Sequence, residues 1–318
     1  MSDRRFLLGY NTCGFSHTTD IDHILRVIHS TGYQGVELTL DKRHYHPHHH
    51  DRSVLERIKS FLTSSGMVNV LATGARYVLS DVKHEPSMVS ADDGARTRWM
   101  AFLVESIKMG EELQSDCVML HSGYQPKGVE KARAWDWMVQ EVTELCRVAR
   151  EHGQRLGMEF HPDMFLRTYD DFKRLKQDVG AVNFGLTLDV GHCECTESTS
   201  TADIIRECLQ DVFNIHLDDI DSRVHKHLML GQGQIDFKEI FRVLSEVGYR
   251  GLASVELNAD DIGVADDELA VDSYGYLVER VSKGPFIIRR PAERVGHERR
   301  RRHTTGELPE PGVVRSTA

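Results

Sequence analysis

Residues 155–217 contain three short apolar segments, which read Arg155-Leu-Gly-Met-Glu-Phe160, Phe184-Gly-Leu-Thr-Leu-Asp189 and Val212-Phe-Asn-Ile-His-Leu217. Between them, residues 169–177 and 202–209 space their apolar side chains three and four positions apart, as an amphipathic helix does. Short apolar segments that alternate with helical segments are typical of parallel strands joined by crossover helices. This stretch therefore predicts three consecutive units of an α/β fold.

The same alternation runs along most of the chain and gives eight units. The predicted strands are Phe6–Tyr10, Gly35–Thr39, Val68–Ala72, Cys117–His121, Arg155–Phe160, Phe184–Asp189, Val212–Leu217 and Gly251–Leu257. The predicted helices are Ile21–His29, Ser53–Leu62, Thr97–Leu113, Trp135–Ala149, Tyr169–Gln177, Ala202–Leu209, Phe237–Val247 and Asp267–Val281. A chain of 318 residues with 40% hydrophobic content can fill the core of one barrel of about 250 residues. We predict a single TIM (β/α)8 barrel over residues 1–284.

The end of the chain differs from the rest in charge. Residues 284–318 carry eight arginines and four glutamates, so the formal charge of −10 leaves about −14 on the remainder. The run Arg299–Arg302 predicts a basic, disordered tail over residues 285–318, of which residues 294–318 are dispensable for folding and catalysis. A contact of this tail with a nucleic acid or a partner is the alternative. The acidic remainder would repel a polyanion, so we do not expect a nucleic-acid partner.

The chain lacks the sequence signals of membrane and secreted proteins. No apolar run reaches 18 residues, and residues 1–5 lead directly into a predicted strand without the pattern of a signal peptide. Six cysteines lack the dense spacing of a disulfide-stabilised secreted domain, so we expect free thiols. These observations predict a cytoplasmic protein with no membrane partner. The sequence leaves open whether the protein is a homo-oligomer.

Four predicted strands end at a side chain that can bind a metal ion. Glu159, Asp189, His216 and Glu256 lie at the ends of the fifth to eighth strands. The carboxyl ends of barrel strands meet at one mouth, where a buried charge is costly unless it is paired or bound to a metal. Three carboxylates and one imidazole suit a divalent cation. For any one of these residues alone, a salt bridge or a position on the rim is the alternative.

Further polar side chains lie near the same mouth. Glu37 lies on the second predicted strand, His121 ends the fourth, and His225 and His227 lie in the loop after the seventh. Each of them either binds a second metal ion or the substrate, or makes a polar contact at the rim. The run His44–His50 lies several residues beyond the second strand. This run either forms a mobile lid or has no role in the site.

Two motifs resemble the xylose-isomerase-like barrel superfamily, and the resemblance covers about residues 7–281. They are Gly185-Leu-Thr-Leu-Asp189-Val-Gly-His192, and His216-Leu-Asp-Asp219 followed by Leu230-Gly-Gln-Gly-Gln-Ile-Asp236. The superfamily includes sugar isomerases, ketose 3-epimerases, inosose dehydratases and endonuclease IV. In its ketose-epimerase branch, one divalent ion is bound by the positions that match Glu159, Asp189, His216 and Glu256. The resemblance implies that the two glutamates also move protons and that His192 contacts the substrate.

The endonuclease IV branch implies a different reaction. Residues 223–233 are similar to the segment that binds the third zinc in that family. Further positions of this chain that match its ligands are His121, Glu159, Asp189, His192, His216 and Glu256. Two departures weaken this resemblance, because residues 72–78 offer no histidine and His225 stands where an aspartate is usual. A multi-metal hydrolase of a small phosphoester, or a lyase similar to inosose dehydratase, is therefore the alternative.

The resemblance and the strand ends together predict a metal-dependent isomerase or epimerase of carbohydrate metabolism, acting on a sugar, a cyclitol or a sugar phosphate. Glu159 and Glu256 would transfer protons next to a metal-bound carbonyl, and Glu37 and His192 would bind the substrate. A site rich in carboxylates suits Mn²⁺, Mg²⁺ or Co²⁺, whereas additional imidazoles favour Zn²⁺ or Fe²⁺ if more than one ion binds. The sequence leaves open which substrate and which metal the protein uses. Because both glutamates are present, a barrel that has lost catalysis is disfavoured.

Overall fold

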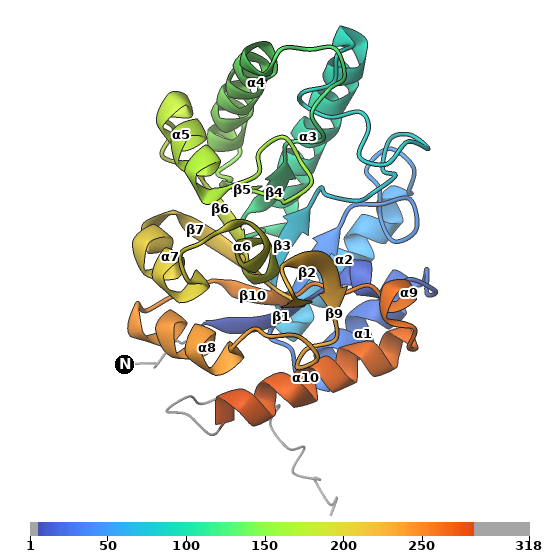
Figure 1. Cartoon of the computed structure of the whole chain (residues 1–318). Helices are drawn as coiled ribbons and strands as arrows, with labels where there is room; N and C mark the ends of the chain where they lie inside the picture. Colours follow the sequence, from blue (N-terminus) through green and yellow to red (C-terminus); the bar gives the residue numbers. More distant parts are fainter. Residues whose placement is uncertain (1–5, 283–318) are drawn as a thin grey trace, which may run out of the picture. The chain divides into compact units, whose positions relative to one another are not determined.

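The computed structural model describes residues 6–282, and within them eight parallel strands close into a barrel (Figure 1). Neighbouring strands follow the order of the chain, and the last strand, β10, pairs with β1. The strands are β1 (Leu7–Asn11), β2 (Gly35–Thr39), β3 (Val68–Ala72), β4 (Val118–His121), β5 (Leu156–Glu159), β6 (Phe184–Asp189), β7 (Val212–Leu217) and β10 (Leu252–Val255). This is the TIM barrel that the sequence predicts.

Helices surround the barrel and connect its strands (Figure 1). The long ones are α1 (Ile21–Thr31), α2 (Arg52–Ser65), α3 (Asp93–Leu113), α4 (Lys131–Glu151), α5 (Tyr169–Val179), α7 (Thr201–Cys208), α8 (Phe237–Glu246) and α10 (Asp266–Ser282). Several begin directly after a polar residue whose side chain accepts hydrogen bonds from the first turn, as Asp20 does for α1 and Asp51 does for α2. Shorter helical segments are η1 (Thr12–Gly14), α6 (Val190–Thr196), η2 (Leu209–Asp211) and α9 (Ala259–Ile262).

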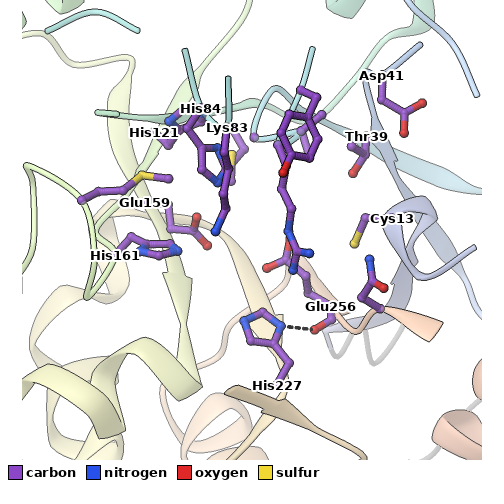
Figure 2. A pocket seen from close by; sticks show the side chains of 18 of the residues that line it. Cys13, Thr39, Asp41, Lys83, His84, His121, Glu159, His161, His227 and Glu256 are labelled. Carbon is purple, nitrogen blue, oxygen red and sulfur yellow. Dashed lines mark hydrogen bonds between the residues drawn. The ribbon is translucent and has the colours of Figure 1, made fainter. Parts of the chain in front are cut away.

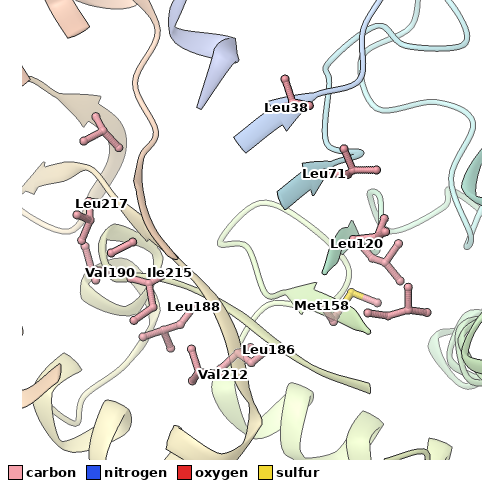
Figure 3. Packing of buried hydrophobic residues seen from close by; sticks show 14 of the residues in the cluster. Leu38, Leu71, Leu120, Met158, Leu186, Leu188, Val190, Val212, Ile215 and Leu217 are labelled. Carbon is pink, nitrogen blue, oxygen red and sulfur yellow. The ribbon is translucent and has the colours of Figure 1, made fainter. Parts of the chain in front are cut away.

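Alternate side chains of each strand face the helices and the barrel interior. Met158, Leu186 and Leu188 belong to the main hydrophobic core between strands and helices (Figure 3). Burial of one such side chain contributes about 1.5–3 kcal/mol. Glu159 and Asp189 occupy the alternate positions, so the same period that builds the core directs these two carboxylates into the barrel.

A second, smaller apolar cluster fills the barrel interior away from the strand ends. It consists of Val70, Cys117, Phe213 and Leu252. Gly9 and Gly35 make room for Leu252, because a Cβ atom at either position would overlap the leucine side chain. The polar side chains at the carboxyl ends of the strands therefore lie above an apolar layer inside the barrel.

The sequence locates the barrel strands closely and misses one hairpin. β2, β3, β6 and β7 have the predicted bounds, and the other four barrel strands differ by one or two residues at their ends. The antiparallel hairpin of β8 (Asp219–Asp221) and β9 (Val224–Leu228) is not predicted. In the described part of the chain all six cysteines are unpaired, as expected, and no helix has the length and apolar character needed to cross a membrane. The predicted tail, residues 285–318, lies outside the described residues.

Candidate metal centre

A cavity of about 530 Å³ opens at the carboxyl ends of the barrel strands. Residues of the β2 and β3 loops, the ends of β4 and β5, the β8–β9 hairpin and the segment after β10 line it. Figure 2 shows Glu159, His161, Glu256 and His227 around one part of this cavity. Both glutamates that the sequence predicts as proton-transfer residues therefore face the space where barrel enzymes bind their ligands.

Three carboxylates and one imidazole meet at this end of the barrel. We call Glu159, Asp189, His216 and Glu256 the carboxylate cluster, and one potential ligand atom of each lies within 4.8 Å of the other three. Nδ1 of His216 lies 2.8 Å from Oε1 of Glu159 and 2.9 Å from Oε2 of Glu256. The same nitrogen lies 3.8 Å from Oδ2 of Asp189. The four residues meet because β5, β6, β7 and β10 are consecutive neighbours in the barrel.

Glu37 fixes the orientation of His216. Nε2 of His216 lies 2.9 Å from Oε1 of Glu37, and Oε2 of Glu37 accepts from the side-chain amide of Asn214 at 3.1 Å. Donation from Nε2 to a carboxylate directs Nδ1 towards the rest of the cluster, as in many metal-binding histidines. Glu37 is fully buried and is not among the residues that line the cavity. Its position therefore favours a role in orienting His216 over the substrate contact that the sequence suggests.

The two carboxylate oxygens of Asp189 have different environments. Oδ1 accepts the backbone N–H of His192 at 2.7 Å and so caps α6. Oδ2 is buried and has no hydrogen-bond partner among residues 6–282. A buried polar atom without a partner costs about 1–3 kcal/mol, and more when it is charged. A cation held by the carboxylate cluster would remove this cost, so the donor set fits a divalent ion.

The carboxylate cluster holds three acidic groups and only one basic group. Burial raises the pKa of Glu159 to about 7, although His216 opposes the shift. Burial and the charge of Asp218 raise the pKa of Asp189 well above its usual range. Burial lowers the pKa of His216, but Glu256 and the other nearby glutamates reverse this and raise it well above its usual range. The cluster therefore attracts protons, and a bound cation would supply the same positive charge.

Four imidazoles form a second group beside the carboxylate cluster. We call His161, His192, His225 and His227 the histidine cluster, and the first three each offer a ring nitrogen within 4.8 Å of the other two. Nε2 of His225 lies 3.3 Å from Nε2 of His192 and 3.2 Å from Nε2 of His227. The structure thus brings together His192, His225 and His227, which the sequence suggests for a second metal ion or for the substrate.

The other ring nitrogens indicate where the hydrogens of two of these imidazoles lie. Nδ1 of His192 donates to the carbonyl oxygen of Phe160 at 3.1 Å, and Nδ1 of His225 donates to the carboxylate of Asp163 at 2.9 Å. Burial lowers the pKa of both histidines, so both rings are neutral and their Nε2 atoms carry lone pairs. Two lone pairs 3.3 Å apart repel each other. A cation between these nitrogens would replace the repulsion by attraction.

Asp219 holds the hairpin that carries His225 and His227. The Asp219 carboxylate accepts four backbone N–H groups at 2.8–3.1 Å. The donors are Ile220, Gly231, Gly233 and Ile235. A Cβ atom at Gly233 would overlap the Asp219 carboxylate. The motif Leu230-Gly-Gln-Gly233 therefore wraps a buried carboxylate and fixes the hairpin.

Sequence reasoning missed two residues at this site, His161 and Asp218. The ring centroid of His161 lies 4.5 Å from those of His192 and His225. Asp218 is fully buried, and its Oδ2 lies 3.6 Å from Nε2 of His227. Burial lowers the pKa of His227, but the charges of Asp218, Glu256 and Glu159 and the hydrogen bond to the Glu256 carbonyl together raise it. Their positions in the sequence could have identified them, because each lies two residues after a member of the carboxylate cluster.

His121 lines the cavity but belongs to neither cluster. Its ring lies 5.3 Å, between centroids, from that of His84, which sequence reasoning also missed. His84 lies in the long connection between β3 and α3, whose path the hydrophobic period does not predict. The sequence therefore gave no reason to place His84 next to the end of β4.

The run His44–His50 forms part of the fold. Its ring nitrogens make no group of three at metal-binding distance in the described part of the chain. His46 is buried and stacks on Phe102 with 5.3 Å between ring centroids. Nδ1 of His46 accepts the N–H of His48 at 3.1 Å, and Nδ1 of His50 accepts the N–H of His46 at 2.9 Å. These contacts fix a turn after β2, so they do not favour the interpretation as a mobile lid.

The fold and the site define a class: closed parallel β/α barrels that gather carboxylates and histidines at the carboxyl ends of their strands. A family model described as a xylose isomerase-like TIM barrel matches residues 25–279. The chain belongs to this family, as its sequence motifs imply.

The chain is similar to individual proteins at low sequence identity. An inosose isomerase of Halalkalibacterium halodurans is 29% identical over 127 residues, which are 37% of this chain and 45% of that protein. The crystal structure of a D-tagatose 3-epimerase-like protein matches with a TM-score of 0.72 and 20% identity, over 87% of this chain and 98% of that one. A crystal structure of IOLI protein with a bound zinc atom matches with a TM-score of 0.70 and 18% identity, over 87% and 99% of the two chains. At these identities the solved structures support the fold.

Proposed function

We propose that this protein is a divalent-metal-dependent isomerase or epimerase of a sugar, a cyclitol or a sugar phosphate. The observation that carries the proposal is the placement of Glu159 and Glu256, which both line the cavity and both contact Nδ1 of His216. Two carboxylates at one metal-type site suit the removal and return of a proton. The names of two similar proteins, an inosose isomerase and a D-tagatose 3-epimerase-like protein, support the same class of reaction.

Glu159, Asp189, Glu256 and Nδ1 of His216 would hold the ion. When bound, the ion would withdraw electron density from a substrate carbonyl and so acidify the hydrogen on the adjacent carbon. The side-chain amide of Asn11 donates to Oε1 of Glu256 at 3.1 Å and holds this carboxylate in place. Three carboxylates favour Mn²⁺, Mg²⁺ or Co²⁺, although the structural relative with bound zinc supports Zn²⁺ as a candidate.

Proton transfer is the task of the two glutamates. Glu159 ends β5 and Glu256 follows β10, so their carboxylates approach the cavity from different strands. One glutamate takes the proton from the carbon next to the carbonyl, and the other returns a proton. Return to the opposite face of the same carbon gives an epimer, and return to the neighbouring carbon gives an isomer. His192 also lines the cavity, where it would bind a substrate hydroxyl group.

The test follows the carbon-bound hydrogen. The metal-loaded protein is incubated in heavy water with inosose, D-tagatose and other ketoses, and NMR follows exchange at the carbon next to the carbonyl. We expect exchange or rearrangement that a chelator stops and metal restores. Glu159→Gln or Glu256→Gln should reduce the rate about 10²–10⁴-fold, as expected for loss of an acid–base group. Glu130→Gln, on an exposed residue before α4, is the matched control.

Absence of exchange with every ketone, together with metal-dependent cleavage of a phosphodiester, would overturn the proposal. The second candidate function is therefore a multi-metal hydrolase. The specific observation in its favour is the pair of neutral imidazoles, His192 and His225, whose Nε2 atoms face each other. The number of ions per chain in protein purified without chelator separates the candidates. One ion favours the isomerase or epimerase, and two or three favour the hydrolase.

A further inference from the structure

One wall of the cavity carries nitrogen groups that the proposed proton transfer does not use. Arg76, Lys83 and His84 come from the connection after β3, His121 ends β4, and all four line the cavity. Figure 2 shows Lys83, His84 and His121 on the same side of the cavity as Glu159. A substrate whose reacting carbons lie at Glu159 would therefore have this wall within reach of its remote end.

The two imidazoles of this wall have unused polar atoms. His121 is 1% exposed and His84 is 8% exposed. The N–H of Gly123 donates to Nδ1 of His121 at 3.2 Å, so the neutral ring carries its hydrogen on Nε2. Within residues 6–282, neither Nε2 of His121 nor Nδ1 of His84 has a hydrogen-bond partner. Buried polar atoms are nearly always paired, so these two nitrogens are the points on this wall where a hydrogen-bond partner is lacking.

Both imidazoles are uncharged at neutral pH. Burial lowers the pKa of His121 to about 4 and the pKa of His84 to about 2. Burial is the main cause of the shift at His84, and the charges of Lys83 and Arg76 lower its pKa further. The backbone of His84 has φ of 55°, a left-handed conformation that is rare for a residue with a side chain. Its N–H donates to the carbonyl oxygen of Arg76 at 2.7 Å, which holds the ring on this wall.

Lys83 provides the positive charge of the wall. Its ammonium group forms no ion pair with a carboxylate of the described residues, whereas Arg76 pairs with Asp261 at 2.9 Å. Asp81 comes from the same connection and also lines the cavity, but among the described residues it forms no ion pair with Lys83. The wall therefore combines an open ammonium group with buried imidazoles.

We propose that Arg76, Lys83, His84 and His121 bind an anionic oxygen group of the substrate, either a phosphate or a carboxylate. The inference rests on the proposed function, because it concerns the end of the substrate that does not react. Ammonium, guanidinium and N–H groups donate hydrogen bonds, and phosphate and carboxylate oxygens accept them. A metal ion fits this wall less well, because His84 and His121 gather no third ligand within metal-binding distance among the described residues.

The test compares pairs of ligands that differ in one anionic group. Calorimetry with the metal-loaded protein measures D-ribulose against D-ribulose 5-phosphate, and D-fructose against 2-keto-D-gluconate. We expect the anionic member of at least one pair to bind about tenfold more tightly or better, and the pair that shows it identifies phosphate or carboxylate. Lys83→Met should remove about tenfold of that affinity and change binding of the neutral sugar by less than twofold. Lys127→Met, on an exposed loop outside the cavity, should change neither.

Equal binding within both pairs, no measurable binding, or an anion preference that survives Lys83→Met would overturn this inference. Binding does not require turnover, so the result is separate from the exchange experiment. Proton exchange on ketoses without an anion preference would retain the proposed function and reject the anion site. An anion preference that depends on Lys83, without any proton exchange on ketoses, would retain the anion site and reject the proposed function.

Discussion

The cavity and the loop after β2 each contain a group of histidines, and the two groups use their ring nitrogens differently. In the histidine cluster, Nδ1 of His192 and of His225 donates to protein oxygens, and the Nε2 atoms face each other beside the cavity. In the run His44–His50, ring nitrogens of His46 and His50 accept backbone N–H groups of the run itself. The first group offers lone pairs to a ligand, and the second uses them to close a turn.

The difference shows why a count of histidines does not predict a metal site. A histidine becomes a candidate ligand when one ring nitrogen is fixed by a protein oxygen and the other faces a cavity. The run has the higher density of histidines in the sequence, yet its ring nitrogens make no metal-type group in the part of the chain that the structure describes. Whether a histidine is a candidate ligand therefore depends on what surrounds its second ring nitrogen.

The largest expected effect comes from removing one imidazole of each group. If the histidine cluster holds a second ion, as the multi-metal hydrolase requires, His225→Asn should weaken zinc binding there about 100-fold or more, because it removes a ring nitrogen that faces Nε2 of His192. His48→Asn, on an exposed residue of the run, should leave zinc binding unchanged. Metal content per chain and competition with a chromogenic chelator measure both. Equal loss in the two variants would remove the distinction between the groups.

The next effect concerns the hairpin that carries two members of the histidine cluster. Asp219→Ala leaves four backbone N–H groups without their acceptor, so we expect a loss of about 3 kcal/mol or more in the free energy of unfolding. Zinc binding by the histidine cluster should fall as well, because His225 and His227 lose their fixed positions. Asp221→Ala, on an exposed residue of the same hairpin, is the control. Denaturant titration would contradict the prediction if both variants had the stability of the wild type.

The sequence predicts the barrel because apolar strands and amphipathic helices repeat through most of the chain. It misses the hairpin because β8 has only three residues and β9 reads Val-His-Lys-His-Leu, without the apolar pattern of a barrel strand. The carboxylate cluster was predictable because the strands that carry it end at one mouth. Its convergence is observed, and its binding of a metal stays a prediction.

The rest of the site depends on parts of the chain without a regular period. His161 lies two residues beyond the end of β5, and Lys83 and His84 lie in a 20-residue connection between β3 and α3. No rule of spacing predicts which residues of such a connection turn back over the barrel mouth. Glu37 is a different case. Its strand and its position near the barrel mouth are predicted from the sequence, but its contact with His216 is visible only in the structure.

A smaller effect should follow from changing the residue that orients His216. Glu37→Gln keeps an oxygen that can accept from Nε2 of His216 but removes the negative charge. We expect metal binding at the carboxylate cluster to weaken about 10–100-fold with the barrel intact. Glu56→Gln, on the exposed surface of α2, is the matched control. Unchanged affinity in Glu37→Gln would mean that Asn214 and the neighbouring strands are sufficient to orient the imidazole.

The smallest expected effect belongs to the histidine run, through the buried ring of His46. Burial and the neighbouring imidazoles lower the pKa of His46 to about 4, whereas an unfolded histidine has a pKa of about 6.5. Between these values the unfolded chain binds a proton that the folded chain does not, so His46 destabilises the fold as the pH falls through this window, and the effect levels off below pH 4. We expect it to cost about 1–2 kcal/mol between pH 7 and pH 5.

His46→Asn tests this assignment, because its amide oxygen can still accept the N–H of His48 but cannot titrate. The variant should be less stable than the wild type at pH 7, where it loses the stacking on Phe102. Its free energy of unfolding should nevertheless fall less between pH 7 and pH 5, while His48→Asn should follow the wild-type profile. If His46→Asn and the wild type lose stability in parallel, the acid sensitivity comes from other buried histidines, such as His121, whose pKa burial also lowers to about 4. The turn after β2 would then contribute packing alone, and the contrast with the cavity would rest on metal binding.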